Sequence, residues 1–479
     1  MFFIATGLIE AIWGFRQLQG WAYSNHSLFR LTGSFFNPGP YSGYLAITLP
    51  VALGILLEQS KRNMPYYLSM GCIGTAIVVL PAGMSRSAWI AVVVSCAWVY
   101  ALYRLDRKQA ATRLRQHKRW YIIGGILGGI LLLGGSASLY TLKKDSADGR
   151  FLMWKITTKA IQKQPITGTS LGGFPAAYAE TQAEYMASGK ATEQEKLVAG
   201  CPEYAFNEYL QIGLEQGLIG LALFIGWLGL LFYKGIKNKR YACCGGLMSL
   251  AIFAFSSYPL QLPEFWVVLI FLGVMSVTPD KDEIRENQAE SNGHRWGKQI
   301  FFMGIAILGI SLFWMQKDHY KAYQQWNKAQ MFYNNKAYEA ALEVYEPLYP
   351  LLKHKPEFLF EAAQCLSKTG QYEKANEYLK RAVLLSSDPM LYYVMAKNEQ
   401  CLGEYRQAEK HLLHAIDILP ERIYPYYLLM NLYTEPSYFQ PAKLKMAIDS
   451  VLTKKPKVES SAIKEMKEKA RSMLNNTSI

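Results

Sequence analysis

The chain has 479 residues, a formal net charge of +14 and 51% hydrophobic residues. A basic chain of this kind can indicate nucleic-acid binding. Here, however, the basic residues cluster in short loops between apolar runs, which is the charge pattern of a polytopic membrane protein and excludes the nucleic-acid interpretation. The mean hydropathy of +0.01 averages two unlike parts, an apolar part up to about residue 316 and a polar, Lys- and Glu-rich part from about residue 318.

The apolar part contains about nine runs that are long enough, or nearly so, to cross a bilayer, which takes roughly 17–25 residues. They are Phe2–Leu18, Tyr41–Leu57, Tyr66–Leu80, Ala88–Tyr103, Trp120–Tyr140, Leu218–Tyr233, Tyr241–Tyr258, Phe265–Val277 and Ile300–Met315. We therefore expect an all-α polytopic membrane bundle over residues 1–316, with a large loop at 141–217. Glu10 lies inside the first run, where it either faces an aqueous cavity or is buried in its neutral form.

The basic residues predict the orientation of this bundle. Three loops that alternate on one side are rich in Lys and Arg: Lys61-Arg62, Arg104–Arg119 and Lys234–Arg240. We assign these loops, and with them the N-terminus, to the cytoplasm. The opposite, outer face then carries everything after Met315 and three arginines that each lie beside the end of a span: Arg30, Arg86 and Arg150.

The polar C-terminal part is repetitive. Alanines and tyrosines recur at spacings of 34 and 33 residues: Ala329, Ala363 and Ala396, and Tyr338, Tyr372 and Tyr405. A Gly-x-Tyr-x-x-Ala pattern with this period resembles tetratricopeptide repeats. We expect an α-solenoid over 318–453, with a weaker fourth unit from Tyr424 and a C-terminal helix or tail at 454–479. Cys365 and Cys401 can pair only in an oxidising compartment.

The polar interval from Asp145 to Leu221 is where we expect any chemistry. Guanidinium groups match phosphate oxygens in pairs and keep their charge, so Arg86 and Arg150 are candidate phosphate ligands, with Arg30 a weaker one. The alternative for each is a lipid-headgroup anchor. Asp145 and Asp148 are a weak alternative as metal ligands. The glycines of this interval either let backbone approach a phosphate or form only turns: Gly168, Gly172 and Gly173.

The same region resembles the O-antigen ligase family, which includes O-antigen polymerases and protein O-oligosaccharyltransferases. Its ligases show a His, then Asn or a similar residue, nine residues, Gly, two residues and Gly. Asn207, Gly217 and Gly220 fit this spacing. The upstream residues of the family pattern are matched by Arg150, Trp154, Pro165 and Gly168, and SRSAW around Arg86 and GSFFNP after Arg30 are also similar. The similarity covers roughly residues 20–280.

One residue departs from this family pattern. Phe206 occupies the position of the family's histidine, and phenylalanine cannot move a proton. Either a neighbouring acid, Glu203 or Glu208, takes the role of base, or the histidine is not an obligatory base. Both acids have the alternative of being solvated loop residues. Tyr204 and Asn207 are candidates for orienting an acceptor hydroxyl, and Trp154 and Gly168 complete the expected substrate-binding set.

The resemblance implies a GT-C-like glycosyltransferase in the bacterial inner membrane, with the repeats in the periplasm. The donor would be a glycan on a polyprenyl diphosphate, transferred with inversion and without a metal or cofactor. The acceptor would be lipid A–core for a ligase or a growing glycan for a polymerase. A protein acceptor is the first alternative, presented by the repeats, which are the expected site of a protein partner. A non-enzymatic assembly scaffold or transporter is the second.

Overall fold

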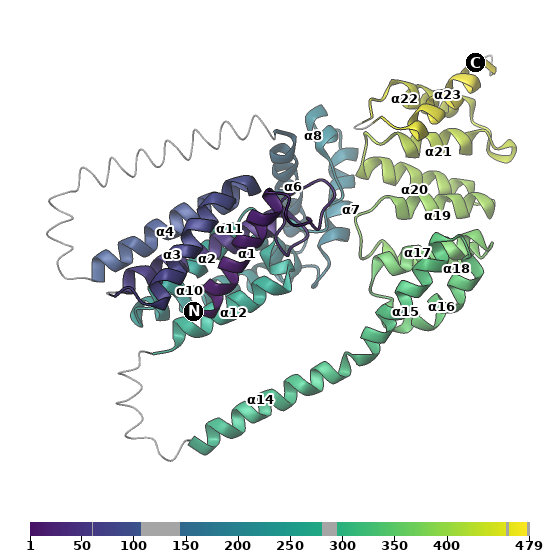
Figure 1. Cartoon of the computed structure of the whole chain (residues 1–479). Coiled ribbons are helices and arrows are strands. Elements are labelled where there is room, and N and C mark those ends of the chain that lie inside the picture. Colours follow the sequence, from purple (N-terminus) through teal and green to yellow (C-terminus); the bar gives the residue numbers. More distant parts are fainter. Residues whose placement is uncertain (60, 107–143, 280–294, 457–458, 477–479) are drawn as a thin grey trace. The chain divides into compact units, whose positions relative to one another are not determined.

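The computed structural model describes residues 1–59, 61–106, 144–279, 295–456 and 459–476, and within these ranges every regular element is a helix (Figure 1). The all-α prediction is therefore confirmed for the part of the chain that is described. The expected span at Trp120–Tyr140 lies outside it. The chain forms two compact units, which we describe separately. The first comprises Met1–Ala147, Pro165–Gly168 and Tyr204–Glu290, and the remaining segments form the second.

The first unit is a bundle of apolar helices. In chain order they are α1 (Phe2–Leu18), α2 (Pro38–Glu58), α3 (Met64–Val79), η1 (Leu80–Gly83), α4 (Arg86–Asp106), α9 (Glu208–Glu215), α10 (Gly217–Lys237), α11 (Tyr241–Ala254), η2 (Pro259–Gln261) and α12 (Pro263–Val277). Among the residues that the structure describes, four helical segments are long and apolar enough to cross a membrane: Pro38–Glu58, Met64–Gly83, Arg86–Leu105 and Gly217–Lys237.

Two expected spans form helices that are short for crossing a bilayer. The run Tyr241–Tyr258 is helical only to Ala254, and Tyr258, the residue before Pro259, lies outside the helix with the non-helical geometry that is usual before a proline. The run from Phe265 is part of α12, which has 15 residues. At 1.5 Å per residue such a helix is about 22 Å long, less than the roughly 30 Å of a bilayer core.

Helix α2 is the most buried of these four long apolar helices, and small residues let its neighbours approach closely. A Cβ atom on Gly54 would lie 2.6 Å from the Cα of Ala242 in α11, and a Cβ on Gly43 would overlap the ring of Phe253. The Ser249 hydroxyl donates to the Ala46 carbonyl across the same contact, at 2.7 Å. Close packing at small residues is the usual way in which apolar helices associate when no water is expelled between them.

The second unit contains the repeats, as four helix pairs with a final helix. The pairs are α15 (Lys317–Asn334) with α16 (Tyr338–Leu352), α17 (Pro356–Lys368) with α18 (Tyr372–Ala382), α19 (Met390–Cys401) with α20 (Tyr405–Ile418), and α21 (Ile423–Tyr433) with α22 (Pro441–Thr453). α14 (Arg295–Met315) precedes them, η3 (Pro436–Tyr438) joins the last pair, and α23 (Ser461–Asn476) follows. Figure 1 shows the pairs stacked in chain order.

The repeated alanines lie at the contacts between these helices. All six are at most 2% exposed: Ala329, Ala341, Ala363, Ala375, Ala396 and Ala408. Gly370 and Gly403 form the turns within their pairs at φ +83° and +80°, values that favour glycine. Lys336 takes the equivalent position of the first pair at φ +60°. The tetratricopeptide-like repeat prediction is confirmed. The thiols of Cys365 and Cys401 are both free.

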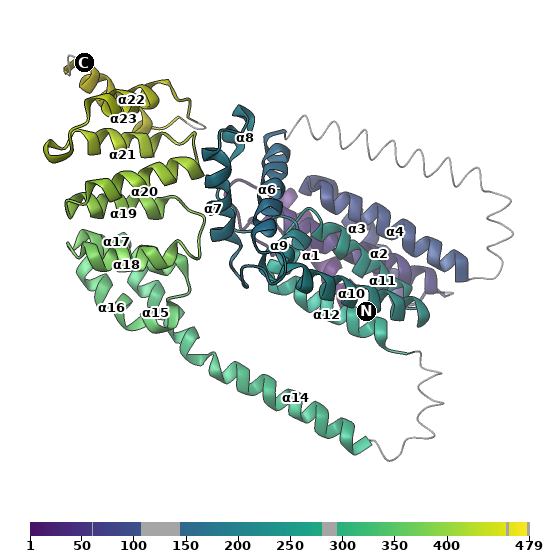
Figure 2. The ribbon, with the colours of Figure 1, turned by 180° about the vertical axis from the view of Figure 1, so that it is seen from behind.

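Part of the segment expected as one long loop belongs to the second unit. It forms α6 (Lys144–Lys163), most of which groups with the repeats, α7 (Phe174–Ala187) and α8 (Glu193–Val198). Helix α7 packs against α20, and the two lie side by side in both ribbon views (Figures 1 and 2). The amide of Gln182, which is fully buried, donates to the carbonyls of Ile418 and Gly200 at 2.8 and 3.1 Å.

Candidate functional site

Arg86 is the first residue of α4, at the end of a tight turn. Met84 has a left-handed backbone at φ 46°, and the indole nitrogen of Trp89 donates to the Leu80 carbonyl at 3.1 Å, so the SRSAW sequence fixes how α3 connects to α4. The Arg86 side chain is half-buried, and within the described residues it has no recorded ion pair. Because the first turn of a helix presents unpaired N–H groups and a partial positive charge, this end of α4 favours an anion.

A cavity of about 450 Å³ lies beside this helix end, within the first unit. α4, α9 and the C-terminal end of α11 with the residues after it contribute to its walls. The lining residues are Ser87, Ile90, Tyr209, Ala251, Ile252, Phe255 and Ser256. The Tyr209 hydroxyl donates to the Ala251 carbonyl at 2.9 Å, which joins α9 to α11. The result is a mostly apolar cavity next to a cationic helix end.

Helix α9 begins at the residues that carry the family spacing. Asn207, which is 4% exposed, caps the helix by accepting from the Leu210 N–H at 3.1 Å. The carboxylate of Glu208 is 1% exposed and accepts from the Leu260 N–H at 2.6 Å and from the Gln261 amide at 2.9 Å. Burial raises the pKa of the Glu208 carboxyl to about 7, despite the lowering effect of these two hydrogen bonds.

The junction between α9 and α10 packs against the turn at residues 165–168. Gly217 has φ +69°, and a Cβ on it would overlap the Ile166 carbonyl. Gly168 has φ +70°, and a Cβ there would lie 2.5 Å from the Glu215 carbonyl carbon. The Leu218 N–H donates to the Pro165 carbonyl at 2.8 Å. Both glycines therefore allow two backbone segments to pack closely. This packing explains why glycine occupies these two positions, without any ligand.

Phe206, at the position of the family's histidine, packs in an aromatic cluster. Its backbone is left-handed at φ 50°, and its ring meets the edge of Tyr258 with centroids 4.9 Å apart. The ring of Tyr204 stacks on the ring of Tyr258, with the centroids 5.4 Å apart and an angle of 15° between the ring planes. The aromatic side chain at 206 thus has a packing role in this chain.

Arg150 and Trp154 lie one helical turn apart in α6, so they share a face of that helix. Both are half-buried. The same helix is fixed to α7 and α8 by Lys155, whose ammonium donates to the Tyr185 hydroxyl and to the Glu195 carboxylate, each at 2.6 Å. The hydrogen bond to Glu195 raises the pKa of Lys155. α6 is therefore a helix that α7 and α8 support within the expected loop.

The remaining predicted residues are dispersed. Arg30 is exposed on the loop after α1, which the buried amide of Gln17 holds by bonds to Thr32 and Gly33. Glu203 is exposed. Asp148 accepts from Gln194 at 3.2 Å, and the described residues contain no cluster of metal-ligating side chains.

The predicted residues divide between the two units. The first contains Arg30, Arg86, Gly168, Tyr204, Asn207 and Glu208, and the second contains Arg150, Trp154 and Glu203. A common site for Arg86 and Arg150 stays a prediction. Sequence reasoning missed Gln17, Tyr209 and Lys155. Of these three residues, only Gln17 could have been found from the sequence. A polar residue at the end of an apolar run indicates a buried amide that bonds to neighbouring backbone.

Comparison with known proteins gives a family for part of the chain. The O-antigen ligase family matches residues 42–225, which include the Arg86 turn, α6 and the start of α9. The chain carries an O-antigen ligase domain. This domain is typical of membrane glycosyltransferases of the ligase and polymerase class, and together with four apolar helices it indicates a membrane protein.

The repeats match a different family. Residues 334–415 match the family described as anaphase-promoting complex, cyclosome, subunit 3. A solved structure titled "Crystal structure of MamA protein" is 18% identical, covers 32% of this chain and 88% of its own, and has a TM-score of 0.27. No curated protein matches the chain.

Proposed function

We propose that the chain transfers a glycan from a polyprenyl diphosphate to an acceptor hydroxyl on the periplasmic side of a bacterial inner membrane. The observation that carries this proposal is the cationic end of α4 beside an apolar cavity, inside an O-antigen ligase domain. A polyprenyl diphosphate has the same two parts, a dianionic or more highly charged headgroup and a long apolar chain.

In this proposal the diphosphate of the donor binds at the first turn of α4, and its prenyl chain lies along the cavity. The Arg86 guanidinium and the N–H groups of the helix end contact the phosphate oxygens. Ile90, Ile252 and Phe255 line the cavity and would contact the prenyl chain. Arg150, the other arginine of the family pattern, contacts the same diphosphate from α6, where Lys155 supports the helix.

The reaction is a substitution at the anomeric carbon. The acceptor oxygen forms a bond to that carbon while the bond to the diphosphate oxygen breaks, with its electron pair remaining on the diphosphate. Arg86 and Arg150 neutralise the charge that develops there, which lowers the barrier because these groups are already oriented. Attack opposite to the leaving group inverts the anomeric carbon.

The acceptor proton goes to Glu203 in this scheme. Burial raises the pKa of Glu208, but both of its oxygens already accept hydrogen bonds and the side chain is 1% exposed. Glu203 is exposed and lies three residues before Phe206, where ligases of the family have their histidine. We therefore assign Glu208 to holding α9 against η2 rather than to proton transfer.

The acceptor is most simply another glycan or lipid A–core, as for O-antigen polymerases and ligases. A protein acceptor is the second candidate, and one observation favours it. Helices α6 and α7 form one unit with the repeats, so a protein bound to the repeats would be held on the same unit as Arg150.

Deletion of the gene tests both candidates by what accumulates. Unlinked lipid-borne polymer indicates a ligase, single repeat units indicate a polymerase, and unglycosylated proteins indicate a protein transferase. Complementation with Arg86→Ala or Arg150→Ala should fail at normal protein level, whereas Arg104→Ala, on the expected cytoplasmic side, should restore the product. Normal surface glycan with both outer-face variants contradicts the proposed site.

A further inference from the structure

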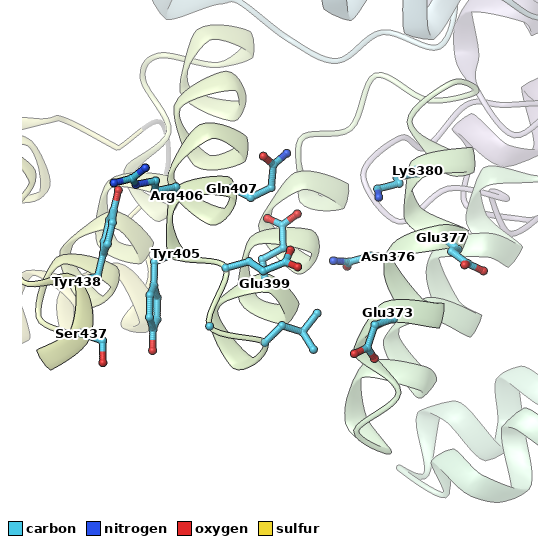
Figure 3. A pocket seen from close by; sticks show the side chains of 13 residues that line it. Glu373, Asn376, Glu377, Lys380, Glu399, Tyr405, Arg406, Gln407, Ser437 and Tyr438 are labelled. Atoms are coloured by element: carbon cyan, nitrogen blue, oxygen red, sulfur yellow. The ribbon is translucent and has the colours of Figure 1, made fainter.

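The repeats contain a polar groove that the proposed function does not use (Figure 3). It has a volume of about 860 Å³, within the range of clefts that bind ligands. Helix α18, the turn between α19 and α20, and η3 form its walls. All of these elements belong to the second unit, so the groove is independent of how the two units are arranged.

The floor of the groove is formed by two buried polar side chains. Asn376 is 6% exposed and Glu399 is 2% exposed. Asn376 accepts from the Asn398 amide at 2.8 Å, and one oxygen of Glu399 contacts the His411 ring at 2.8 Å. The other Glu399 oxygen has no recorded partner, and Figure 3 shows this carboxylate directed into the space between Asn376 and Gln407. Glu399 thus presents one carboxylate oxygen to the groove, where a donor from a ligand can reach it.

The walls add further carboxylates that have no cation of their own. Elsewhere on the repeats, three glutamates form ion pairs with lysines: Glu346 with Lys374, Glu409 with Lys443, and Glu421 with Lys454. Glu373, Glu377 and Glu404 line the groove, and no ion pair is recorded for them among the described residues. The groove thus concentrates negative charge in a chain that is strongly basic overall.

Two cationic side chains also line the groove, but they lie at its sides. Figure 3 shows Lys380 beside Glu377 at one side and Arg406 beside Tyr438 at the other, with Glu399 between them. Tyr405 and Tyr438 stack with centroids 5.6 Å apart. Aromatic faces of this kind attract a lysine or arginine side chain. The centre of the groove is therefore acidic, and one end offers aromatic surface.

We propose that this groove binds an extended segment of a partner protein that carries lysine or arginine side chains. One such side chain reaches Glu399 and donates to its free oxygen, while the neighbouring ones pair with Glu373, Glu377 and Glu404. The amides of Asn376 and Gln407 are positioned for the backbone of the segment. Opposite charge at the groove supplies both affinity and the choice of partner.

The test is a binding titration of the full chain in lipid nanodiscs with labelled peptides, followed by fluorescence anisotropy. A short peptide of alternating Lys and Gly should bind, and its affinity should fall as salt is raised. A peptide with Glu in place of Lys, and a neutral oligosaccharide, should bind at least about tenfold more weakly, the loss expected when a charged hydrogen bond is removed. Equal binding of the three probes overturns the proposal.

Two sets of variants locate the site. Glu399→Gln keeps the shape of the floor and should weaken binding of the Lys peptide about tenfold. The double variant Glu373→Gln with Glu377→Gln should also weaken binding of the Lys peptide. Neither side chain is buried, so this variant should fold normally even if Glu399→Gln does not. Glu357→Gln, an exposed glutamate of α17 outside the groove, is the matched control. Unchanged binding by the double variant, or equal loss with the control, overturns the assignment.

Discussion

Gly217 and Ile166 meet backbone against backbone, where the start of α10 packs on the turn at residues 165–168. No other residue type has room at 217, because the Ile166 carbonyl occupies the space of a Cβ atom and φ is +69°. The Leu218–Pro165 hydrogen bond holds the same contact. The glycine spacing of the O-antigen ligase domain therefore has a structural cause here, which is the packing of two segments about 50 residues apart.

Gly217→Ala should destabilise the first unit by about 2–4 kcal/mol, the cost of a left-handed alanine together with overpacking. The loss should appear as a lower unfolding midpoint in detergent. Gly226→Ala is the matched control, because Gly226 lies in the same helix and a Cβ there meets nothing within 4 Å. Equal midpoints for the two variants would contradict the packing role.

Glu208 should make stability depend on pH. Its folded pKa of about 7 lies above its ordinary value of 4.5. Between these values the folded chain holds a proton that the unfolded chain releases. The stabilisation is complete below about pH 4.5 and is lost as the pH rises through about 7, by on the order of 3 kcal/mol.

Thermal unfolding between about pH 5 and about pH 8 measures this effect. Glu208→Gln cannot titrate, so the wild type should lose stability relative to this variant as the pH rises. Glu203→Gln, at an exposed position, should leave the pH dependence of the wild type in place. A wild type and a Glu208→Gln variant with parallel curves would show that the carboxyl is not buried as described.

Gln182 should be essential to the contact between α7 and the repeats. Gln182→Leu leaves the Ile418 and Gly200 carbonyls and the Tyr178 hydroxyl without their partner. The expected cost is about 3 kcal/mol, with faster hydrogen exchange in both α7 and α20. Gln194→Leu, at an exposed position, should change stability by less than about 0.5 kcal/mol. Unchanged exchange in α7 of the Gln182 variant would refute the contact.

Periodic features of the fold were predictable from the sequence. The repeats depend on local spacing, so Tyr372 and Gly370 indicated a helix pair directly, and Lys336 was missed as the equivalent of Gly370 only because lysine rarely adopts φ +60°. The ends of the helices were harder to predict from the sequence. The apolar run to Tyr258 continued past Ala254, because hydropathy does not report the Ser-Ser-Tyr-Pro sequence that ends the helix.

Contacts between distant segments were not predictable in the same way. The arginines of the candidate site follow from family spacing, but the burial of Glu208 depends on a hydrogen bond to Leu260, 52 residues away. Nor does periodicity report that α7 packs on α20, a contact between residues more than 200 positions apart. Long-range hydrogen bonds leave no regular pattern in one sequence.

The central claim is that Arg86 and Arg150 contact one diphosphate, and a double-mutant cycle of donor binding tests it most directly. The full chain in nanodiscs would be titrated with a polyprenyl diphosphate, using Arg86→Gln, Arg150→Gln, the double variant and Arg104→Gln as control. We predict about a tenfold loss for each single variant and a coupling of roughly 0.5 kcal/mol or more between them. Wild-type affinity in either single variant, or strictly additive losses, would contradict a shared site.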